Sequence, residues 1–516
     1  MKIWPTNLGM LCLVSVSSFC AGSGDIRLAE AVENKDASAV VSLLQQHVDV
    51  NVPEPDGSTA LAWAVHWDDL KTVNLLILAG ANVNAANDNG ATPLWLACYN
   101  GSADMVERLL EAGANPNAGH LPAGETALLR CAGTGNVNAV QSLLTHGADV
   151  NAKEESGQTA LMWALEERHP EVERVLIEHG ADVNAVSRRG FTPLLFAARQ
   201  GDVESARLLL EKGASLDATA QTSGANGGAA PTNGLLWFQK YKENTDPLFL
   251  AIHSGREQFA IFLLEHGANP NAVDALGMAP LHYALVEGIS DLSGAWRDPH
   301  HGGIDFVFRP NMAELVQALL SHGANPNVRI LKRVPPLMAQ ERPNISLIGA
   351  TPFLLAAATG DVRVMKLLLA KGADPLLTTE DGTTPLMAAA GISRRDDRTK
   401  EEERNALEAL NLIVELGGEV NASNQNGLTA MHGAAFTGAN EIIQYLADRG
   451  AKLDVKDKFG ESPLSIAAGD PNGLAEEITR SMHQSTEALL RRLMGDYTSL
   501  VNATPGVDIS RAKTGQ

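Results

Sequence analysis

Residues 90–117 read GATPLWLACYNGSADMVERLLEAGANPN, and this stretch decides the fold. Thr92 can cap the start of a helix, and Pro93 directly after it suits the first helical turn. A short helix containing alanine would follow, and then a second helix that carries a leucine pair. Gly113 stands where a helix end needs a left-handed residue. The stretch therefore predicts a unit of two short helices that ends in a turn.

The same phrase returns along the chain. Its glycine and threonine start recurs at Gly57, Gly90, Gly124, Gly157 and Gly190, at intervals of 33, 34, 33 and 33 residues. Later copies begin near residues 246, 277, 349, 382, 427 and 460, and a degenerate first copy covers about residues 25–51. Units of fixed length that bury their apolar faces only against their neighbours form a solenoid.

These half-motifs and their period resemble the ankyrin repeat family, over roughly 90% of the chain that follows the first residues. The resemblance implies an all-α fold, an ankyrin-repeat solenoid of about twelve stacked helix-turn-helix units with short β-turn or hairpin connections. Members of this family commonly bind partner proteins with their turn tips and with the concave surface of their helices. The resemblance thus implies a protein–protein interaction scaffold rather than an enzyme.

The first residues have the pattern of a signal peptide. Lys2 supplies a positive start, an apolar stretch covers residues 8–19, and small residues follow. The apolar part is too short to span a bilayer. We expect a signal peptide at 1–22 with cleavage near residues 20–22, no integral membrane segment afterwards, and export to the periplasm or the cell exterior.

The repeats also predict the organisation of the rest of the chain. Insertions in a solenoid become loops on one side, where they either carry function or reflect drift that costs little. The sequence does not decide between these two readings. The predicted segments are repeats at 25–217, an insert at 218–244, repeats at 245–468 with inserts at 289–310, 328–347 and 392–405, a C-terminal capping helix at 469–496 and a tail at 497–516.

Charge and cysteine content restrict the classes of partner and site. The formal net charge of −21 argues against nucleic acid or anionic lipid, because both require a positive surface, and leaves a protein partner. Of the four cysteines, Cys98 and Cys131 lie on first helices of adjacent repeats. Packed helices are about 8–10 Å apart, so we expect these two cysteines to be small buried residues without a disulfide.

No residue pattern nominates a catalytic centre, a metal site or a cofactor. Histidines that directly precede a helix-ending glycine can bind exposed carbonyls, and His282 and His432 are expected to bond the backbone. His300 and His301 lie in an insert beside acidic residues, but adjacent histidines reach one ion with difficulty. Two alternatives stay open: a metal- or ligand-binding protein or enzyme with a pocket built by the inserts, and a secreted effector that acts in another cell.

Helix geometry indicates a binding face. When the threonine of each phrase is numbered zero, positions 2, 5 and 6 form one apolar face, and position 4 lies roughly 100° or more away from it. Large aromatic residues at position 4 are therefore expected on an open surface, where they mark binding hot spots, unless they pack against each other and close it. The predicted partner-binding residues are Trp63, Arg130, Trp163, Phe196 and Tyr283 at position 4, Trp67, Trp95 and Tyr99 nearby on the first helices, and Arg188 and Arg189 in a turn.

Overall fold

The computed structural model describes residues 25–118, 123–218, 220–221, 243–274, 277–293, 310–332, 345–394, 398–469 and 483–495. The chain divides into two compact units, Met1–Asp182 (unit 1) and Val183–Gln516 (unit 2), and each is described by itself. The predicted signal peptide and tail lie outside the described residues. Among the residues that are described, no helix combines the length and the apolar character that a bilayer crossing requires.

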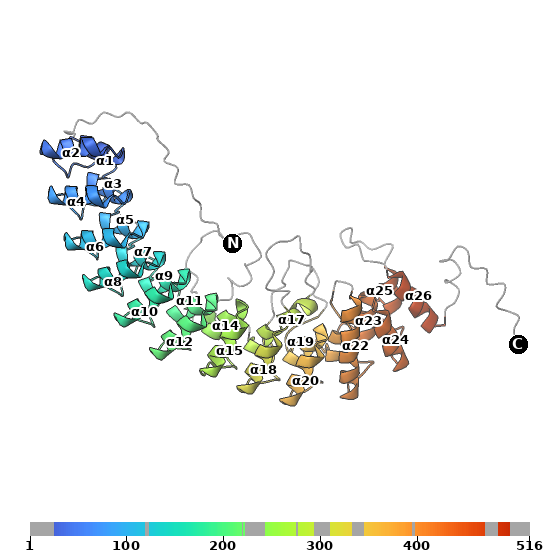
Figure 1. Ribbon diagram of the computed structural model, residues 1–516. Helices are drawn as coiled ribbons and strands as arrows, with labels where there is room; N and C mark the ends of the chain where they lie inside the picture. The colour runs from blue at the N-terminus through green and yellow to red at the C-terminus, as the bar shows by residue number, and fades with distance from the viewer. Residues whose placement is uncertain are drawn as a thin grey trace, which may run out of the picture. The chain divides into compact units, whose positions relative to one another are not determined.

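Unit 1 is a stack of helix pairs. The first helices of successive pairs pack side by side, α1 on α3, α3 on α5, α5 on α7 and α7 on α9, and the second helices α6, α8 and α10 pack in the same order beside them (Figure 1). The helices are α1 Arg27–Glu33, α2 Ala37–Gln45, α3 Ala60–His66, α4 Leu70–Leu78, α5 Pro93–Asn100, α6 Ala103–Glu111, α7 Ala127–Thr134, α8 Val137–Thr145, α9 Ala160–Glu167 and α10 Pro170–Glu178.

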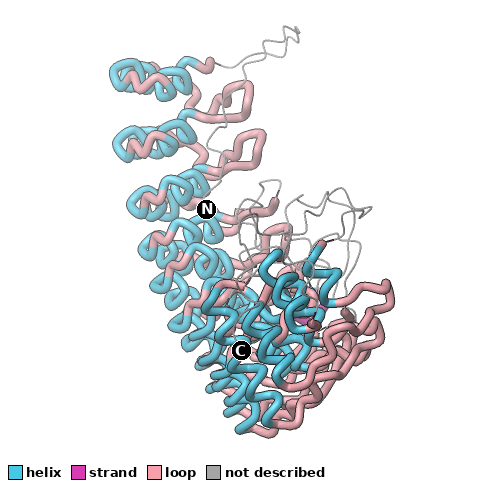
Figure 2. Tube along the Cα trace, turned by 90° about the vertical axis from the view of Figure 1, so that its right-hand side faces the viewer, coloured by secondary structure: helices cyan, strands magenta, loops and turns pink. Residues whose placement is uncertain are grey.

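Unit 2 continues the same pattern with additions. Between α12 and α14, the strands β1 Ala220–Gln221 and β2 Glu243–Thr245 form a short antiparallel pair. The other elements of the described residues are helices, so the predicted all-α solenoid is confirmed, and Figure 2 shows its connections as loops beside the helices. The helices are α11 Pro193–Gln200, α12 Val203–Glu211, α14 Pro247–His253, α15 Glu257–Glu265, α16 Pro280–Ala284, α17 Val286–Ser293, α18 Ala313–Ser321, α19 Pro352–Thr359, α20 Val362–Ala370, α21 Pro385–Ala389, α22 Lys400–Glu415, α23 Ala430–Phe436, α24 Asn440–Asp448, α25 Pro463–Ala468 and α26 Gln484–Leu493.

Local chemistry sets the helix ends. Thr92 Oγ1 accepts the backbone N–H of Trp95 at 3.2 Å, which satisfies a donor that the first turn of α5 would leave unpaired. Pro93 occupies the first turn of the same helix. The glycines expected after second helices all have the left-handed φ that a side chain would strain, with values from 81° to 97° at Gly113, Gly147, Gly180, Gly213, Gly267, Gly323 and Gly450.

The buried core has small side chains on the first helices and larger side chains on the second helices. Ala97, Ala132 and Ala164 on the first helices of unit 1 are fully buried. Because alanine is small, these helices approach each other closely. Leucines on the second helices, including Leu109 and Leu143, fill the space between the layers. Stability therefore comes from interfaces between neighbouring repeats rather than from one central core.

In many repeats an asparagine at the end of the repeat binds the repeat that follows it. Asn117 Nδ2 donates to the Gly147 carbonyl at 2.8 Å, and its Oδ1 accepts the Asp149 N–H at 2.7 Å. Asn51, Asn84 and Asn151 make the equivalent pair of bonds within unit 1. The same arrangement recurs in unit 2 at Asn184, Asn271, Asn327 and Asn421. Each asparagine thus fixes the spacing between two successive turns.

Two predicted boundaries differ from the structure. The insert expected at 392–405 includes the start of a helix, because α22 begins at Lys400. Thr399 accepts the Glu402 N–H while the Glu402 carboxylate accepts the Thr399 N–H, a capping box that starts α22 early. The capping helix expected at 469–496 is shorter in the described residues, where α26 begins after His483 and packs against α25.

Candidate protein-binding surface

The aromatic residues of unit 1 lie where the helix wheel predicts them. A threonine precedes α3, α5, α7 and α9 at the N-cap position, and the fourth residue after it points away from the buried alanines. Trp63, Arg130 and Trp163 occupy this position, Trp95 lies one residue before it on α5, and all four are half-buried. Tyr99, one turn after Trp95, is 57% exposed. These side chains form a surface on the first helices of unit 1.

Arg130 holds three aromatic rings together. Its guanidinium carbon lies 5.1 Å from the ring centroid of Trp95, 5.7 Å from that of Tyr99 and 5.2 Å from that of Trp163. The rings of Trp95 and Tyr99 are themselves stacked, with centroids 5.5 Å apart. We call Trp95, Tyr99, Arg130 and Trp163 the arginine cluster. Cation–π contacts in such an arrangement restrict the rotamers of all four side chains.

Two neighbours position the arginine cluster. Glu125 binds Arg130 with its Oε1 2.6 Å from Nε and its Oε2 2.9 Å from Nη2, so the guanidinium charge is already paired. Trp163 rests on Gly133, where an added Cβ would stand 2.9 Å from Trp163 Cε3. A glycine at this point therefore allows the indole to lie on the helix of the preceding repeat.

A second group of rings lies on α3. The rings of Trp63 and Trp67, which we call the tryptophan pair, are stacked with centroids 6.3 Å apart. Trp63 Nε1 donates to Glu54 Oε2 at 2.8 Å, and Trp67 Nε1 donates to the Glu33 carbonyl at 3.2 Å. The Lys35 ammonium lies 3.7 Å above the Trp67 ring, although Trp67 remains 39% exposed. The tryptophan pair thus already binds one cation of its own chain.

Further carboxylates act on Glu54, which binds Trp63 of the tryptophan pair. Partial burial raises the pKa of Glu54, its bond from Trp63 lowers it, and repulsion from Glu33, Asp56 and Glu30 raises it again, for a net upward shift. Glu33, Asp56 and Glu30 thus add negative charge around Glu54. This end of the surface is therefore electronegative.

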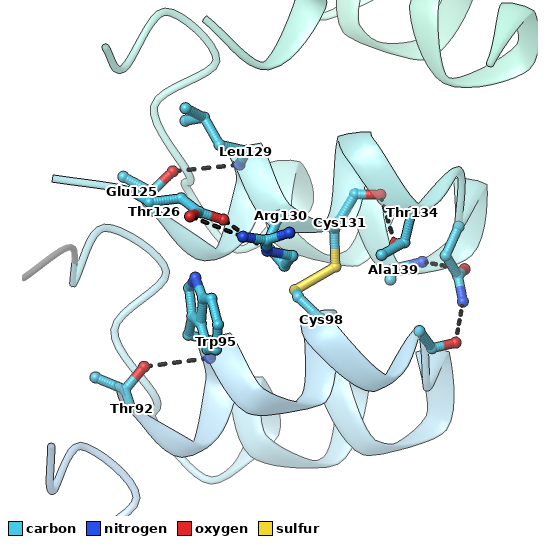
Figure 3. Close-up of a disulfide and its surroundings, with 12 residues drawn as sticks. Thr92, Trp95, Cys98, Glu125, Thr126, Leu129, Arg130, Cys131, Thr134 and Ala139 are labelled. Carbon is cyan, nitrogen blue, oxygen red and sulfur yellow. Dashed lines mark hydrogen bonds and ion pairs between the residues drawn. A yellow bond between two sulfur atoms is a disulfide. The ribbon is translucent and has the colours of Figure 1, made fainter. Parts of the chain in front are cut away.

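Cys98 and Cys131 form a disulfide, so the expectation of two unpaired buried thiols is wrong. Their Cα atoms are 4.7 Å apart, within the range that a disulfide accepts. The expected 8–10 Å separation holds between helix axes, whereas residues that face each other across two alanine-lined helices come much closer. The bond joins α5 to α7, and Figure 3 shows Trp95 and Arg130 next to each other beside it. The disulfide therefore ties together two helices that carry the arginine cluster.

The predicted aromatic residues of unit 2 are not on an open surface. Phe196 is 4% exposed, since Phe191 and the Arg199 guanidinium cover its ring. Tyr283 is 3% exposed, because its hydroxyl donates to Asp274 and its ring packs on His253. The expectation that both point to open solvent is wrong, and neither belongs to a binding surface. The predicted residues Arg188 and Arg189 are exposed in a turn of unit 2.

An insert helix explains why the first-helix face is covered in part of unit 2. Helix α17, which includes the start of the insert expected at 289–310, packs along α19. Gly288 allows this approach, because a Cβ there would lie 2.3 Å from the Leu355 carbonyl oxygen. Leu355 occupies the same fourth position as Trp63 and is fully buried. The surface available in unit 1 is thus closed at this repeat of unit 2.

The inserts also line a cavity, as the alternative of an insert-built pocket requires. A space of about 530 Å³ lies between α17, the start of α20 and the start of α22. On its wall the buried Arg394 binds Asp291 at 3.3 Å and Glu402 at 2.7 Å. These ion pairs join two inserts that are 103 residues apart in sequence. The charged groups of the cavity therefore serve to hold α17 and α22 together.

The histidines have the structural roles that their positions predict. Nδ1 of each histidine before a helix-ending glycine is 2.8 Å from the carbonyl four residues earlier, at His146, His179, His266 and His322. His282 and His432 Nδ1 accept backbone N–H groups at 2.9 and 3.1 Å. In the described part of the chain, no three His, Cys, Asp or Glu side chains gather as metal ligands. His300 and His301 lie outside it.

Comparison with known proteins identifies the repeats. A family model described as "Ankyrin repeats (3 copies)" matches residues 28–120, 128–220 and 402–478. A second model, "Ankyrin repeat", matches residues 245–275 and 348–380. Together these matches cover more than half of the chain.

Curated relatives share the repeats over part of their length. The mouse B-cell lymphoma 3 protein homolog is 32% identical over 222 residues, which are 43% of this chain and 39% of that protein. Human ankyrin repeat and SOCS box protein 3 is 30% identical over 231 residues, 45% of this chain and 35% of that protein. The Arabidopsis thaliana E3 ubiquitin-protein ligase KEG is 27% identical over 229 residues, 42% of this chain and 13% of that protein. The chain therefore spans less than half the length of each of these relatives, and from its repeats and these matches it belongs to the ankyrin repeat family.

Proposed function

We propose that this chain is an exported scaffold that binds a partner protein on the first-helix face of unit 1. Stacked ankyrin repeats are protein–protein interaction scaffolds, because their helices and turns offer an extended preformed surface. The observation that carries the finer proposal is the row of partly exposed aromatic side chains made by the tryptophan pair and the arginine cluster. Aromatic and arginine side chains on one surface are typical of binding hot spots.

Preorganisation supports this choice of face. The Cys98–Cys131 bond, the Glu125–Arg130 ion pair and the Trp163–Gly133 contact hold the arginine cluster in place without a partner. Little side-chain order then remains to be imposed on binding, and the cost of association falls. A rigid aromatic surface of this kind favours docking of another protein.

Two features support export. The first residues have the composition of a signal peptide, with cleavage expected near residues 20–22. A disulfide between buried cysteines persists in oxidising compartments such as the periplasm or the cell exterior, and is rare in the cytosol. Fractionation with mass spectrometry of the mature N-terminus tests this: an intact residue 1 on cytosolic protein would contradict export.

The binding face is tested with the partner captured from the native compartment by the full mature chain. The double substitution Trp67→Ala and Tyr99→Ala removes two exposed rings and should weaken binding about tenfold or more. Leu78→Ala is the matched control, because Leu78 is 80% exposed on the second helix α4. Urea unfolding of each variant checks that the chain is folded under the binding conditions. Equal binding by the double variant and the parent protein would refute this face.

A further inference from the structure

The environment of the tryptophan pair indicates the chemistry of the group that binds there. An indole face attracts cations through its quadrupole, and the attraction grows when carboxylates stand nearby. Trp63 is bound to the Glu54 carboxylate, and Asp56 follows in the same turn. Glu30 and Glu33 of α1 complete the set of acidic groups. Rings and carboxylates together form a receptor for a positive group.

Lys35 shows this preference within the chain itself. It lies in the tight turn after α1, with a left-handed φ of 57°, and its ammonium lies 3.7 Å above the Trp67 ring. Lys35 is an exposed side chain on a flexible stem, so a partner's cation competes with it directly. The position of this ammonium marks where an incoming cation would sit.

The arginine cluster has a different character. Arg130 already supplies the cation between Trp95, Tyr99 and Trp163, and Glu125 neutralises it. This part of the surface therefore offers ring area without a net charge to satisfy. Cation binding belongs to the tryptophan pair, whereas the arginine cluster suits the uncharged side chains of the same partner.

The charge of the whole chain acts in the same direction. Asp and Glu number 61 against 40 Lys and Arg, which gives a formal net charge of −21. A field of this sign accelerates the approach of basic partners and disfavours acidic ones. Long-range attraction and the local receptor thus select the same class of partner.

We infer that the partner protein presents a basic segment, and that a lysine or arginine of this segment binds over the Trp67 ring of the tryptophan pair in competition with Lys35. This inference rests on the proposed function, because it assigns the chemistry of the partner at the proposed face. A capped peptide of alternating lysine and glycine serves as the probe, with its glutamate counterpart as the reference.

Three substitutions in the full mature chain isolate the site. Glu54→Gln keeps an acceptor for Trp63 Nε1 but removes the charge, and should weaken binding of the lysine peptide about fivefold. Asp104→Asn, an equal change of charge on the exposed start of α6, should change the affinity less than about twofold. Lys35→Met removes the competing ammonium and should tighten binding about two- to fivefold. Lys71→Met is its control on the exposed start of α4 and should tighten binding of the lysine peptide less than Lys35→Met does.

Calorimetric titration at about 0.1 M salt measures these affinities. Preference for the lysine peptide, together with larger effects of Glu54→Gln and Lys35→Met than of their controls, supports the inference. Equal affinity for the two peptides, or equal effects of Lys35→Met and Lys71→Met, would overturn it. Failure here leaves the docking face to be judged separately by the Trp67→Ala, Tyr99→Ala capture experiment, which does not depend on the charge of the partner.

Discussion

Removal of the Cys98–Cys131 disulfide should lower the stability of unit 1 by several kcal/mol. The bond closes a loop of 33 residues, for which the chain-entropy relation gives about 12 cal/mol/K of lost freedom in the unfolded ensemble. At 25 °C this corresponds to about 3.7 kcal/mol of stabilisation. Replacing both cysteines by alanine also removes two fully buried sulfur atoms, so we expect a further loss of about 1 kcal/mol.

Urea unfolding followed by tryptophan fluorescence measures this loss, because Trp95 and Trp163 belong to the cluster beside the bond. Three samples separate the contributions: oxidised parent, parent with a thiol reductant, and the Cys98→Ala, Cys131→Ala variant. Reduction should remove the entropic part alone, and the variant should unfold at slightly lower urea than the reduced parent. Coincident curves for oxidised and reduced parent protein would refute the reasoning, as would two free thiols in the denatured, unreduced protein.

Three further outcomes are expected from the structure. Asn117→Ala breaks both bonds to the next repeat and should cost about 1 kcal/mol in urea unfolding, whereas Asn138→Ala on the exposed first turn of α8 should cost nothing. Burial lowers the pKa of His282 from 6.5 to about 4, so below pH 6.5 the unfolded chain binds a proton that the folded unit 2 refuses. Stability should therefore fall by up to about 3 kcal/mol between pH 6.5 and 4, and His282→Gln, measured at both pH values, should lack this component. Gly288→Ala places a Cβ 2.3 Å from the Leu355 carbonyl oxygen and should destabilise unit 2 by about 1 to 3 kcal/mol despite the better helix propensity of alanine; an increase in melting temperature would contradict the packing of α17 on α19.

The fold was predictable because the same short-range chemistry recurs in each repeat. The cap by Thr92, the fixed φ of Pro93 and the left-handed Gly113 depend only on residues a few positions away. The binding asparagines were missed, although they stand in the repeating phrase: Asn117 ends the motif that begins at Gly113. Their partners lie in the following repeat, so only the period of the array indicates them.

The partial exposure of the tryptophans was predictable in unit 1, and the burial of the aromatic residues in unit 2 was not, for a physical reason. A helix wheel gives the direction of Trp63 or Trp163 relative to its own helix, and no later segment covers them fully. Tyr283 has the same direction on its helix, but His253 and Asp274 enclose it. Burial of this kind depends on contacts between repeats, which a wheel does not contain.

The disulfide was not predicted, because the usual distance between packed helix axes is larger than the local Cα distance between Cys98 and Cys131. Cys98 and Cys131 stand on the apolar faces of adjacent first helices, separated by one repeat length of 33 residues. That spacing places two residues opposite each other in a stacked array, and neighbouring alanines let the helices close to a Cα distance of 4.7 Å. A cysteine pair one period apart on an alanine-rich helix is therefore the signal that the sequence offered.

Site-specific photo-cross-linking in the native compartment tests the central claim most directly. A photoreactive residue replaces Tyr99 on the first-helix face or Leu78 on the second-helix side, two positions that are 57% and 80% exposed in the parent chain. Binding on the first-helix face predicts a defined protein adduct from position 99 and none from position 78. An adduct from position 78 alone, or no adduct from position 99 while the partner still co-purifies, would contradict it.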